Sequence, residues 1–485
     1  MSFFGIDFGT TNSTAVNYIP GATHAQRYGD DAGRPYPSIV AIDRATGRAL
    51  SGRYVWEHHE ELTQNGRHYI VQSIKRVLGK GHQVWPTQER QWTPEDVAAE
   101  ILKQLSERAH KLGASHISRA AITIPVDFPA PARKALRAAA TKAGITVSTF
   151  IKEPTAALIR HLPKLKHLHY VGVFDWGGGT LDISILEISN NHIFERATMG
   201  KNSAGDDIDL DLARAVHARI MDQRGDSKKF EEMPPRDQDQ LRTRCEIAKC
   251  SLSGRPSAWV LMQSYGGQEL AIEVERQWFE SIIRRRVEDA IELLAQTLSA
   301  VPLSCDELDR LIVIGGSSKL RLLHERMHTD PRFQAKFQPA EDAEWDVAHG
   351  AAIVDSLPGG YETAESIGII LSDGTFYSIV GPHEKPYESP REAAVALVED
   401  ARQANIILAR ADQGRSNGDA SNIQRILELG VPTAGFDAEA IRVRYSITPD
   451  LVFSVEARSH AFGDESNIVR EYGNLRFAYR MPEST

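Results

Sequence analysis

Cysteine is scarce in this sequence, and long apolar runs are missing from it. Only three cysteines occur among 485 residues, namely Cys245, Cys250 and Cys305. So few cysteines exclude a disulfide-stapled secreted scaffold and favour a reducing compartment. No run of about 18 apolar residues is present, so a membrane span is not expected. Because the first residues also lack the basic and apolar regions of a signal peptide, the expected location is cytoplasmic.

Clusters of metal ligands are lacking in the sequence as well. Cys245 and Cys250 are five positions apart in a helical pattern and do not share a helix face. The pairs His58 with His59 and His167 with His169 come without a convincing third ligand. Surface histidines are the preferred interpretation, and no zinc site is expected there.

Basic charge is also in short supply. Lys and Arg number 56 and Asp and Glu number 65, which gives a formal net charge of −9. Nucleic-acid-binding proteins need a surplus of cations for the phosphate backbone, so the composition argues against that class. The basic run 284–286 is interpreted as a solvated helix face. With 41% hydrophobic and 25% charged residues, the chain is globular rather than collagenous, coiled-coil or disordered.

Up to Leu357 the sequence alternates between short apolar runs and longer helical patterns. The expected strands are 120–125, 170–174, 182–188 and 311–314. The expected helices are 131–144 and 280–298. Alternating strands and helices are typical of an α/β architecture with mixed sheets.

After Leu357 the pattern becomes that of a β protein. Pro358, Gly359 and Gly360 predict a linker over 358–365. The expected strands are 367–371, 376–380, 440–447, 451–457 and 475–481. Short strands separated by turns predict a small all-β sandwich over 366–485, preceded by one α/β domain over 1–357.

Two glycine-rich turns follow expected strands of the α/β part. The segments 5–13 and 174–182 both read apolar-Asp-x-Gly, with threonine shortly after. Glycine lets backbone N–H groups approach phosphate oxygens, and an aspartate at a strand end supplies the charge that Mg²⁺ needs. Two matched turns, tipped by Asp7 and Asp175, predict two subdomains that clamp one nucleotide. A third turn, within 312–319, offers exposed backbone to a nucleoside.

These turns and further motifs resemble the heat-shock 70-kDa (DnaK-like) chaperone family. The further motifs are 74–79, 153–157, 205–209, 245–249, 314–317 and 350–352. The resemblance covers nearly the whole chain and is that of a divergent bacterial-type member. It implies an actin-like (ribonuclease H-like) two-lobed ATPase domain, followed by a peptide-binding β sandwich.

The resemblance also implies which residues bind and hydrolyse ATP. Asp7 and Asp175 would hold hydrated Mg²⁺, and K⁺ is a further candidate cation. Lys75, Glu153, Asp175 and Thr180 would position the attacking water and neutralise charge on the γ-phosphate. The residues expected to contact ATP or ADP are Gly9, Thr10, Thr11, Asn12, Gly177, Gly178, Gly179, Asp182, Gly205, Glu246, Lys249, Ser253, Gly315, Gly316, Ser317, Lys319 and Glu344.

Several of these residues also have a plainer interpretation. Lys75 could be a solvated surface lysine. Glu153, which precedes a proline, could be a helix N-terminal acid stabilised by the helix dipole. Glu246 and Lys249 could form an ordinary surface pair.

Three features depart from the family pattern. The segment 356–366 lacks the apolar run of the family's interdomain linker, which puts the usual coupling of nucleotide state to client affinity in doubt. The chain ends at Thr485 after the β domain, so no helical lid is expected. Thr149 stands where the family commonly has an arginine for J-domain co-chaperones, and the segments 221–239 and 249–269 look shortened. J-domain and exchange-factor partners therefore remain open.

The functional hypothesis is an ATP-dependent, Mg²⁺-requiring chaperone-like ATPase that regulates binding of a polypeptide client. The alternative is an ATP-switched interaction module with little hydrolysis, which binds a dedicated partner protein. A small-molecule kinase on the same fold lacks a sequence signal for its catalytic base. The residues that could contact a client, or could equally fill the sandwich core, are Ile369, Leu371, Leu397, Val398 and Ile407.

Overall fold

The chain forms two compact units. The computed structural model describes residues 2–22, 24–64, 66–81, 83–165, 167–301, 303–340, 342–357, 359–397, 401–412, 423–436 and 438–481. The first unit comprises Met1–Val126, Leu136–Leu186 and Arg196–Ser356. The second comprises Asp127–Ala135, Glu187–Glu195 and Leu357–Thr485. Two short segments of the region expected as one α/β domain thus group with the C-terminal residues.

One mixed sheet of the first unit carries the N-terminal turn. Its strands are β1 (Phe3–Asp7), β2 (Asn12–Tyr18), β3 (Gln26–Tyr28), β4 (Tyr36–Pro37), β10 (Arg119–Ile124) and β11 (Thr146–Lys152). The order is β11-β10-β1-β2-β3, and β4 pairs with β2. β1 runs antiparallel to β2, with Asp7 opposite Thr14, and parallel to β10. The end of β1 therefore lies beside the end of β10.

A second mixed sheet of the first unit carries the other glycine-rich turn. Its strands are β12 (Tyr170–Trp176), β13 (Leu181–Ser189), β14 (His192–Lys201), β17 (Arg310–Ile314) and β18 (Phe337–Pro339), in the order β18-β17-β12-β13-β14. β12 runs parallel to β17, with Asp175 opposite Ile314. The expected strands at 170–174, 182–188 and 311–314 are confirmed to within two residues.

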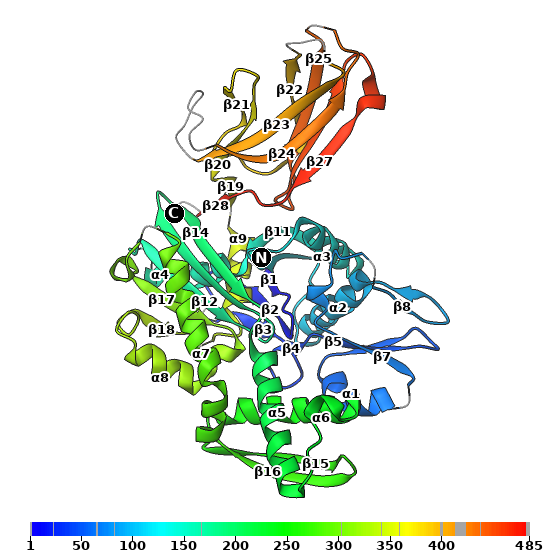
Figure 1. Cartoon of the computed structure of the whole chain (residues 1–485), viewed down its shortest axis with the longest axis vertical. Helices are drawn as coiled ribbons and strands as arrows, with labels where there is room; N and C mark the ends of the chain where they lie inside the picture. Colours follow the sequence, from blue (N-terminus) through cyan, green and yellow to red (C-terminus); the bar gives the residue numbers. More distant parts are fainter. Residues whose placement is uncertain are drawn as a thin grey trace. The chain divides into compact units, whose positions relative to one another are not determined.

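Helices surround these sheets in the first unit (Figure 1). The helices of the chain's described part are α1 (Arg53–Gln64), α2 (Pro94–Lys111), α3 (Ala130–Lys142), α4 (Glu153–Leu165), α5 (Gly205–Arg224), α6 (Pro235–Leu252), α7 (Arg276–Ser299), α8 (Arg321–Thr329) and α9 (Asp346–Ser356). α4 and α9 pack closely, because a Cβ atom on Gly350 would lie 1.8 Å from the carbonyl oxygen of Ala156. None of the described helices is long and apolar enough to cross a membrane.

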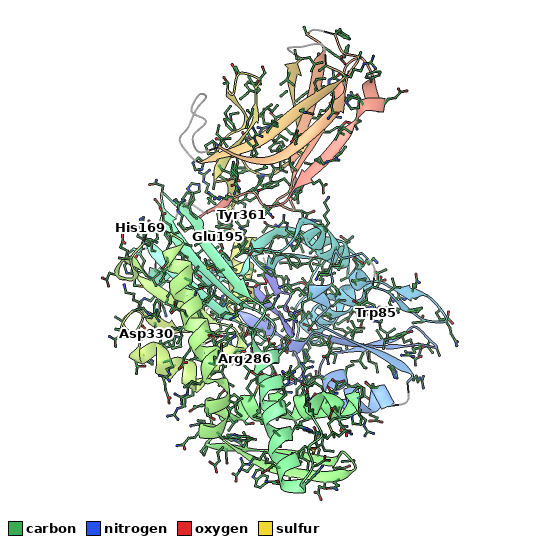
Figure 2. All side chains as sticks on the ribbon, viewed as in Figure 1. Trp85, His169, Glu195, Arg286, Asp330 and Tyr361 are labelled. Carbon is green, nitrogen blue, oxygen red and sulfur yellow. The ribbon has the colours of Figure 1, made fainter. Side chains whose placement is uncertain are left out.

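The remaining strands of the first unit form small sheets. They are β5 (Ile39–Asp43), β6 (Ala49–Ser51), β7 (His68–Gln72), β8 (Trp85–Pro86), β9 (Gln91–Trp92), β15 (Ser257–Tyr265) and β16 (Gln268–Glu275). The hairpin β15–β16 lies next to α6 at one end of the unit (Figure 1). The basic run 284–286 lies on α7. Arg284 and Arg285 are exposed, while Arg286 (Figure 2) forms an ion pair with Asp211.

The C-terminal part of the second unit consists of strands. They are β19 (Gly360–Thr363), β20 (Glu365–Ile370), β21 (Phe376–Val380), β22 (Tyr387–Ala396), β23 (Gln403–Asp412), β24 (Ile423–Pro432), β25 (Ala440–Ile447), β26 (Phe453–Ser459), β27 (Ile468–Tyr472) and β28 (Phe477–Arg480). Two antiparallel sheets have the orders β21-β20-β23-β24 and β22-β25-β26-β27. β24 contacts β26 and β27 of the other sheet. This is a two-layered β arrangement.

Part of the expected linker 358–365 is a strand. β19 pairs antiparallel with β28, which also pairs with the start of β14; Pro358 lies outside the described residues. Among the candidate client contacts, Ile369 is buried in the core, and Leu371, Leu397 and Ile407 are half-buried. Val398 lies outside the described residues.

Candidate functional site

The two glycine-rich turns meet in the first unit. Residues 8–11 join β1 to β2, and residues 177–180 join β12 to β13. A Cβ atom on Gly178 would lie 2.1 Å from Thr11 Oγ1. Only a residue without a side chain allows this approach. The predicted phosphate-binding turns therefore lie against each other.

Further hydrogen bonds brace the second turn. The amide of Gly177 donates to the carbonyl of Thr180 at 3.0 Å, which closes the turn on itself. Ser317 Oγ donates to the carbonyl of Gly177 at 2.8 Å. Arg76 donates to the carbonyl of Gly179 at 2.6 Å. The turn is thus held from two other segments of the unit.

A buried ion pair belongs to the same site. Lys75 Nζ donates to Glu153 Oε1 at 2.7 Å, and the two residues are only 6% and 9% exposed. Lys75 lies in a short 3-10 helix, and Glu153 is the first residue of α4. The interpretation of Lys75 as a surface lysine is therefore wrong. Glu153 does open a helix, as its plainer interpretation expects, and it also pairs with Lys75.

The two aspartates at the strand ends are half-buried carboxyls. Thr123 Oγ1, from the neighbouring strand β10, donates to Asp7 Oδ1 at 2.7 Å. Burial raises the pKa of Asp7 to about 6, and the charge of Glu153 adds to the shift, while Lys75 and Thr123 oppose it. Burial, followed by the charges of Glu153, Asp182 and Asp7, raises the pKa of Asp175 well above its ordinary value.

Lys75 keeps its proton in this environment. Burial alone would lower the pKa of Lys75, but the nearby carboxylates of Glu153, Asp7 and Asp182 outweigh burial and raise it. One ammonium group therefore faces several carboxyl groups. Such a surplus of buried negative charge is stabilised by an added cation.

The residues present fit a magnesium–phosphate group. Thr11 Oγ1 is buried without a hydrogen-bond partner, at the point where the two turns meet. The carboxyl oxygens of Asp7 and Asp175 are the hard donors that Mg²⁺ prefers. A phosphate oxygen could accept a hydrogen bond from the unpaired hydroxyl of Thr11.

Helices α5 and α6 carry three residues predicted to contact ATP or ADP, namely Gly205, Glu246 and Lys249. Lys249 Nζ donates to Asp209 Oδ2 at 2.8 Å and to the carbonyl of Gly205 at 3.2 Å. The side chain of Lys249 is only 12% exposed. The interpretation of Glu246 and Lys249 as an ordinary surface pair is therefore wrong, because Lys249 pairs with Asp209 of α5.

The third turn follows β17. Gly315 has a φ of 87°, and a Cβ atom there would lie 2.5 Å from the carbonyl oxygen of Trp176, so glycine is required. Gly316 has open space at its Cβ position. Lys319 forms an ion pair with Glu344 at 2.9 Å. The remaining predicted residues lie in the first turn (Gly9), at the start of β2 (Asn12) and directly after α6 (Ser253).

A cavity of about 700 Å³ opens in the first unit. Of the predicted site residues, Thr10, Thr11 and Glu246 line it. Its wall carries charges of both signs: three arginines, and the acidic residues Asp206, Asp207, Asp209, Asp239 and Glu246. The arginines are Arg44, Arg76 and Arg242, and the volume is that of a small-molecule site.

Four polar residues of this region were not predicted from the sequence. Arg76 follows Lys75 directly, and Asp206 and Asp209 lie inside the motif 205–209, so both motifs contained the signal. Thr123 lies near the end of an expected strand. Its polar side chain in an apolar run was the only sequence feature that pointed to a role in the site. Its bond to Asp7 depends on the pairing of β10 with β1.

Comparisons with known proteins agree with the motifs. A family model described as Hsp70 protein matches residues 38–474. The Chaperone protein DnaK of Thermosipho africanus is 30% identical over 490 residues, which cover 96% of this chain and 79% of the relative. The Chaperone protein DnaK of Thermotoga maritima is 30% identical over 492 residues with the same shares. The chain therefore belongs to the Hsp70 family, a family of ATP-binding, chaperone-type proteins.

Proposed function

We propose that the chain is a Mg²⁺-dependent ATPase whose nucleotide state regulates the binding of a polypeptide client. The observation that supports it most is the contact of Gly178 with Thr11, next to the buried Lys75–Glu153 pair. Two turns of this composition, one from each sheet, form a place for a triphosphate. The similarity to proteins named Chaperone protein DnaK supports a polypeptide as the client.

Each side chain of the site has its own role in the proposed hydrolysis. Mg²⁺, held by Asp7 and Asp175 directly or through water, would supply positive charge next to the phosphate oxygens. Lys75 stays protonated and neutralises charge that develops on the γ-phosphate. Since Lys75 occupies Oε1 of Glu153, the other oxygen is assigned to accept a hydrogen bond from the attacking water. Thr180 and Asp182 complete the polar surroundings.

Single-turnover hydrolysis of ATP by Lys75→Ala tests this proposal. The rate should fall about 100-fold or more, as for loss of one charge-stabilising donor. Lys103→Ala, which removes an exposed lysine of α2, is the matched control and should keep the wild-type rate. Thermal unfolding of both variants separates lost chemistry from lost fold, because Lys75→Ala leaves Glu153 buried without its cation. An unchanged rate in a folded Lys75→Ala protein would refute the assignment.

One observation favours the alternative, an ATP-switched module with little hydrolysis. The segment in the linker position lacks an apolar run, and Gly360–Thr363 is paired with β28. The affinity of a fluorescent leucine-rich peptide, measured with ATP and with ADP, separates the two functions. Different affinities support the regulated chaperone, whereas peptide binding that ignores the nucleotide supports the alternative.

A further inference from the structure

A second cluster of chemically active side chains lies in the second unit. His192 of β14, Glu362 of β19 and His383, which follows β21, bring one possible ligand atom each to within 4.8 Å of the others. Across the described ranges, this is the one group of three or more His, Cys, Asp or Glu side chains that converges in this way. It contains no residue of the nucleotide site and does not depend on the proposed function.

The distances suit a tetrahedral metal ion. His192 Nε2 lies 3.2 Å from Glu362 Oε2, and His383 Nδ1 lies 3.6 Å from the same oxygen. Zinc binds histidine nitrogen and carboxylate oxygen at about 2.0–2.2 Å, so tetrahedral ligand atoms lie about 3.3–3.6 Å apart. Two of the three pairs are already at this spacing. The third pair, formed by the two histidine nitrogens, lies within 4.8 Å.

The orientation of His192 favours a cation between these groups. Its Nδ1 lies 2.8 Å from the carbonyl oxygen of Asn190 and must carry the hydrogen of that bond. In the neutral ring, Nε2 is then an acceptor that faces a second acceptor, Glu362 Oε2. A metal ion resolves this conflict, and a ring held by a carbonyl at its other nitrogen is the usual support of a metal-binding histidine.

Glu362 is held in place from its other oxygen. Arg480 of β28 lies 3.4 Å from Oε1, which leaves Oε2 to the two histidines. β28 runs between β14 and β19, and Arg480 is paired with both His192 and Gly360. Because side chains alternate along a strand, Arg480, His192 and Glu362 lie on one face of the sheet. The carboxylate is only 3% exposed and therefore requires compensating charge.

The backbone of His383 is set in an uncommon conformation. Its φ is 65°, in the left-handed region that residues other than glycine rarely adopt. The amide of His383 donates to the carbonyl of Thr363 at 2.7 Å, which fixes this turn beside β19. Its side chain is 48% exposed, so a water molecule can reach a fourth coordination position.

We propose that His192, Glu362 and His383 bind one divalent transition-metal ion of the Zn²⁺ type, with water as the fourth ligand. Imidazole nitrogen selects such metals over Mg²⁺, which prefers oxygen ligands. The ion cross-links three segments, and the one with His192 lies 170 positions from Glu362 in the sequence. Metal binding therefore stabilises the second unit against unfolding.

Calorimetric titration of the tag-free, chelator-treated full chain with Zn²⁺ tests the proposal. Excess Mg²⁺ in the buffer occupies the carboxyl groups of the nucleotide site. One Zn²⁺ should bind per chain, and Co²⁺ in its place should give the intense visible absorption of a tetrahedral site. His383→Ala should weaken binding about 100-fold or more and abolish that absorption, since loss of a mere supporting residue already costs about 10–100-fold.

His460→Ala is the matched control, because His460 is an exposed histidine of the same unit. It should bind Zn²⁺ as the wild type does. His383 is the preferred position for substitution since its ring is half exposed, and thermal unfolding checks that the variant is folded. Absence of Zn²⁺ binding, or wild-type affinity in His383→Ala, would overturn the proposal in favour of a protonated histidine–carboxylate network.

Discussion

At Gly178 the absence of a side chain decides how closely two segments approach. The site depends on several such local fits. Gly178 leaves room for Thr11, and Gly315 leaves room for the carbonyl of Trp176. The Lys75 ammonium fits between buried carboxyl groups. Each of these contacts depends on one side chain or on its absence, so a single substitution can test it.

Gly178→Ala should weaken ATP binding while leaving the fold intact. The new methyl group would meet Thr11 Oγ1 and push the two turns apart, and overpacking of this kind costs about 1–3 kcal/mol. We expect the Kd for Mg·ATP to rise about tenfold or more. Gly254→Ala, which meets nothing within 4 Å, should bind ATP like the wild type. Equal Kd values for the two variants would speak against a nucleotide at the contact of the turns.

Single site residues could be proposed from the sequence where they lie in a motif. Asp7 and Asp175 were predicted from the two glycine-rich turns, and Lys75 and Glu153 from the family resemblance. The structure brings all four into one electrostatic cluster. Partners brought by tertiary packing could not be predicted. The clearest case is His192, which lies 170 positions from Glu362, so that no local pattern connects them.

At the scale of elements, burial decides which strands can be recognised from the sequence. Strands buried on both faces, such as β12 and β17, were recognised from their apolar runs. β22 was missed because its sequence includes Pro390 and charged residues and does not alternate. It is an edge strand with a register irregularity between Tyr387 and Arg391, and such strands tolerate proline.

His349 in α9 should make stability depend on pH. Burial, with the Arg160 guanidinium, lowers the pKa of His349 from 6.5 to about 4, while Asp346 opposes the shift. The folded protein thus keeps the ring neutral where the unfolded chain protonates it. Stability should therefore fall as the pH drops from 6.5 to about 4.

His349→Gln should remove this part of the pH dependence. The contribution is on the order of 1 kcal/mol, because the ring is partly exposed and its charge is screened. Urea unfolding of wild type and variant at the two ends of that pH range measures it. If acidification lowers the free energy of unfolding of both proteins by the same amount, His349 is not the cause of the pH dependence in this range.

At the scale of the whole molecule, the two units are not two contiguous halves of the sequence. Arg133, from the early segment Asp127–Ala135, donates to the carbonyls of Phe128 at 2.6 Å and Gly473 at 2.9 Å. Domain bounds drawn from the sequence pattern are contiguous ranges. They could not predict that an early segment packs with residues more than 300 positions later.

Arg133→Ala should destabilise the second unit. Arg133 is 5% exposed, and its loss removes the hydrogen bonds to the carbonyls of Phe128 and Gly473. Hydrogen bonds from a charged group contribute about 1.5–3 kcal/mol each, so the amides of β26 and β27 should exchange hydrogen faster. Arg470→Ala, at an exposed position of β27, serves as the control. Unchanged exchange in Arg133→Ala would show that the early segment contributes little to this unit.

The central claim is that the turns tipped by Asp7 and Asp175 together bind one magnesium triphosphate. Isothermal titration of the purified full chain with ATP in magnesium buffer tests it most directly. One ATP should bind saturably per chain. A titration that shows no heat of ATP association, at several protein concentrations and at more than one temperature, would contradict it.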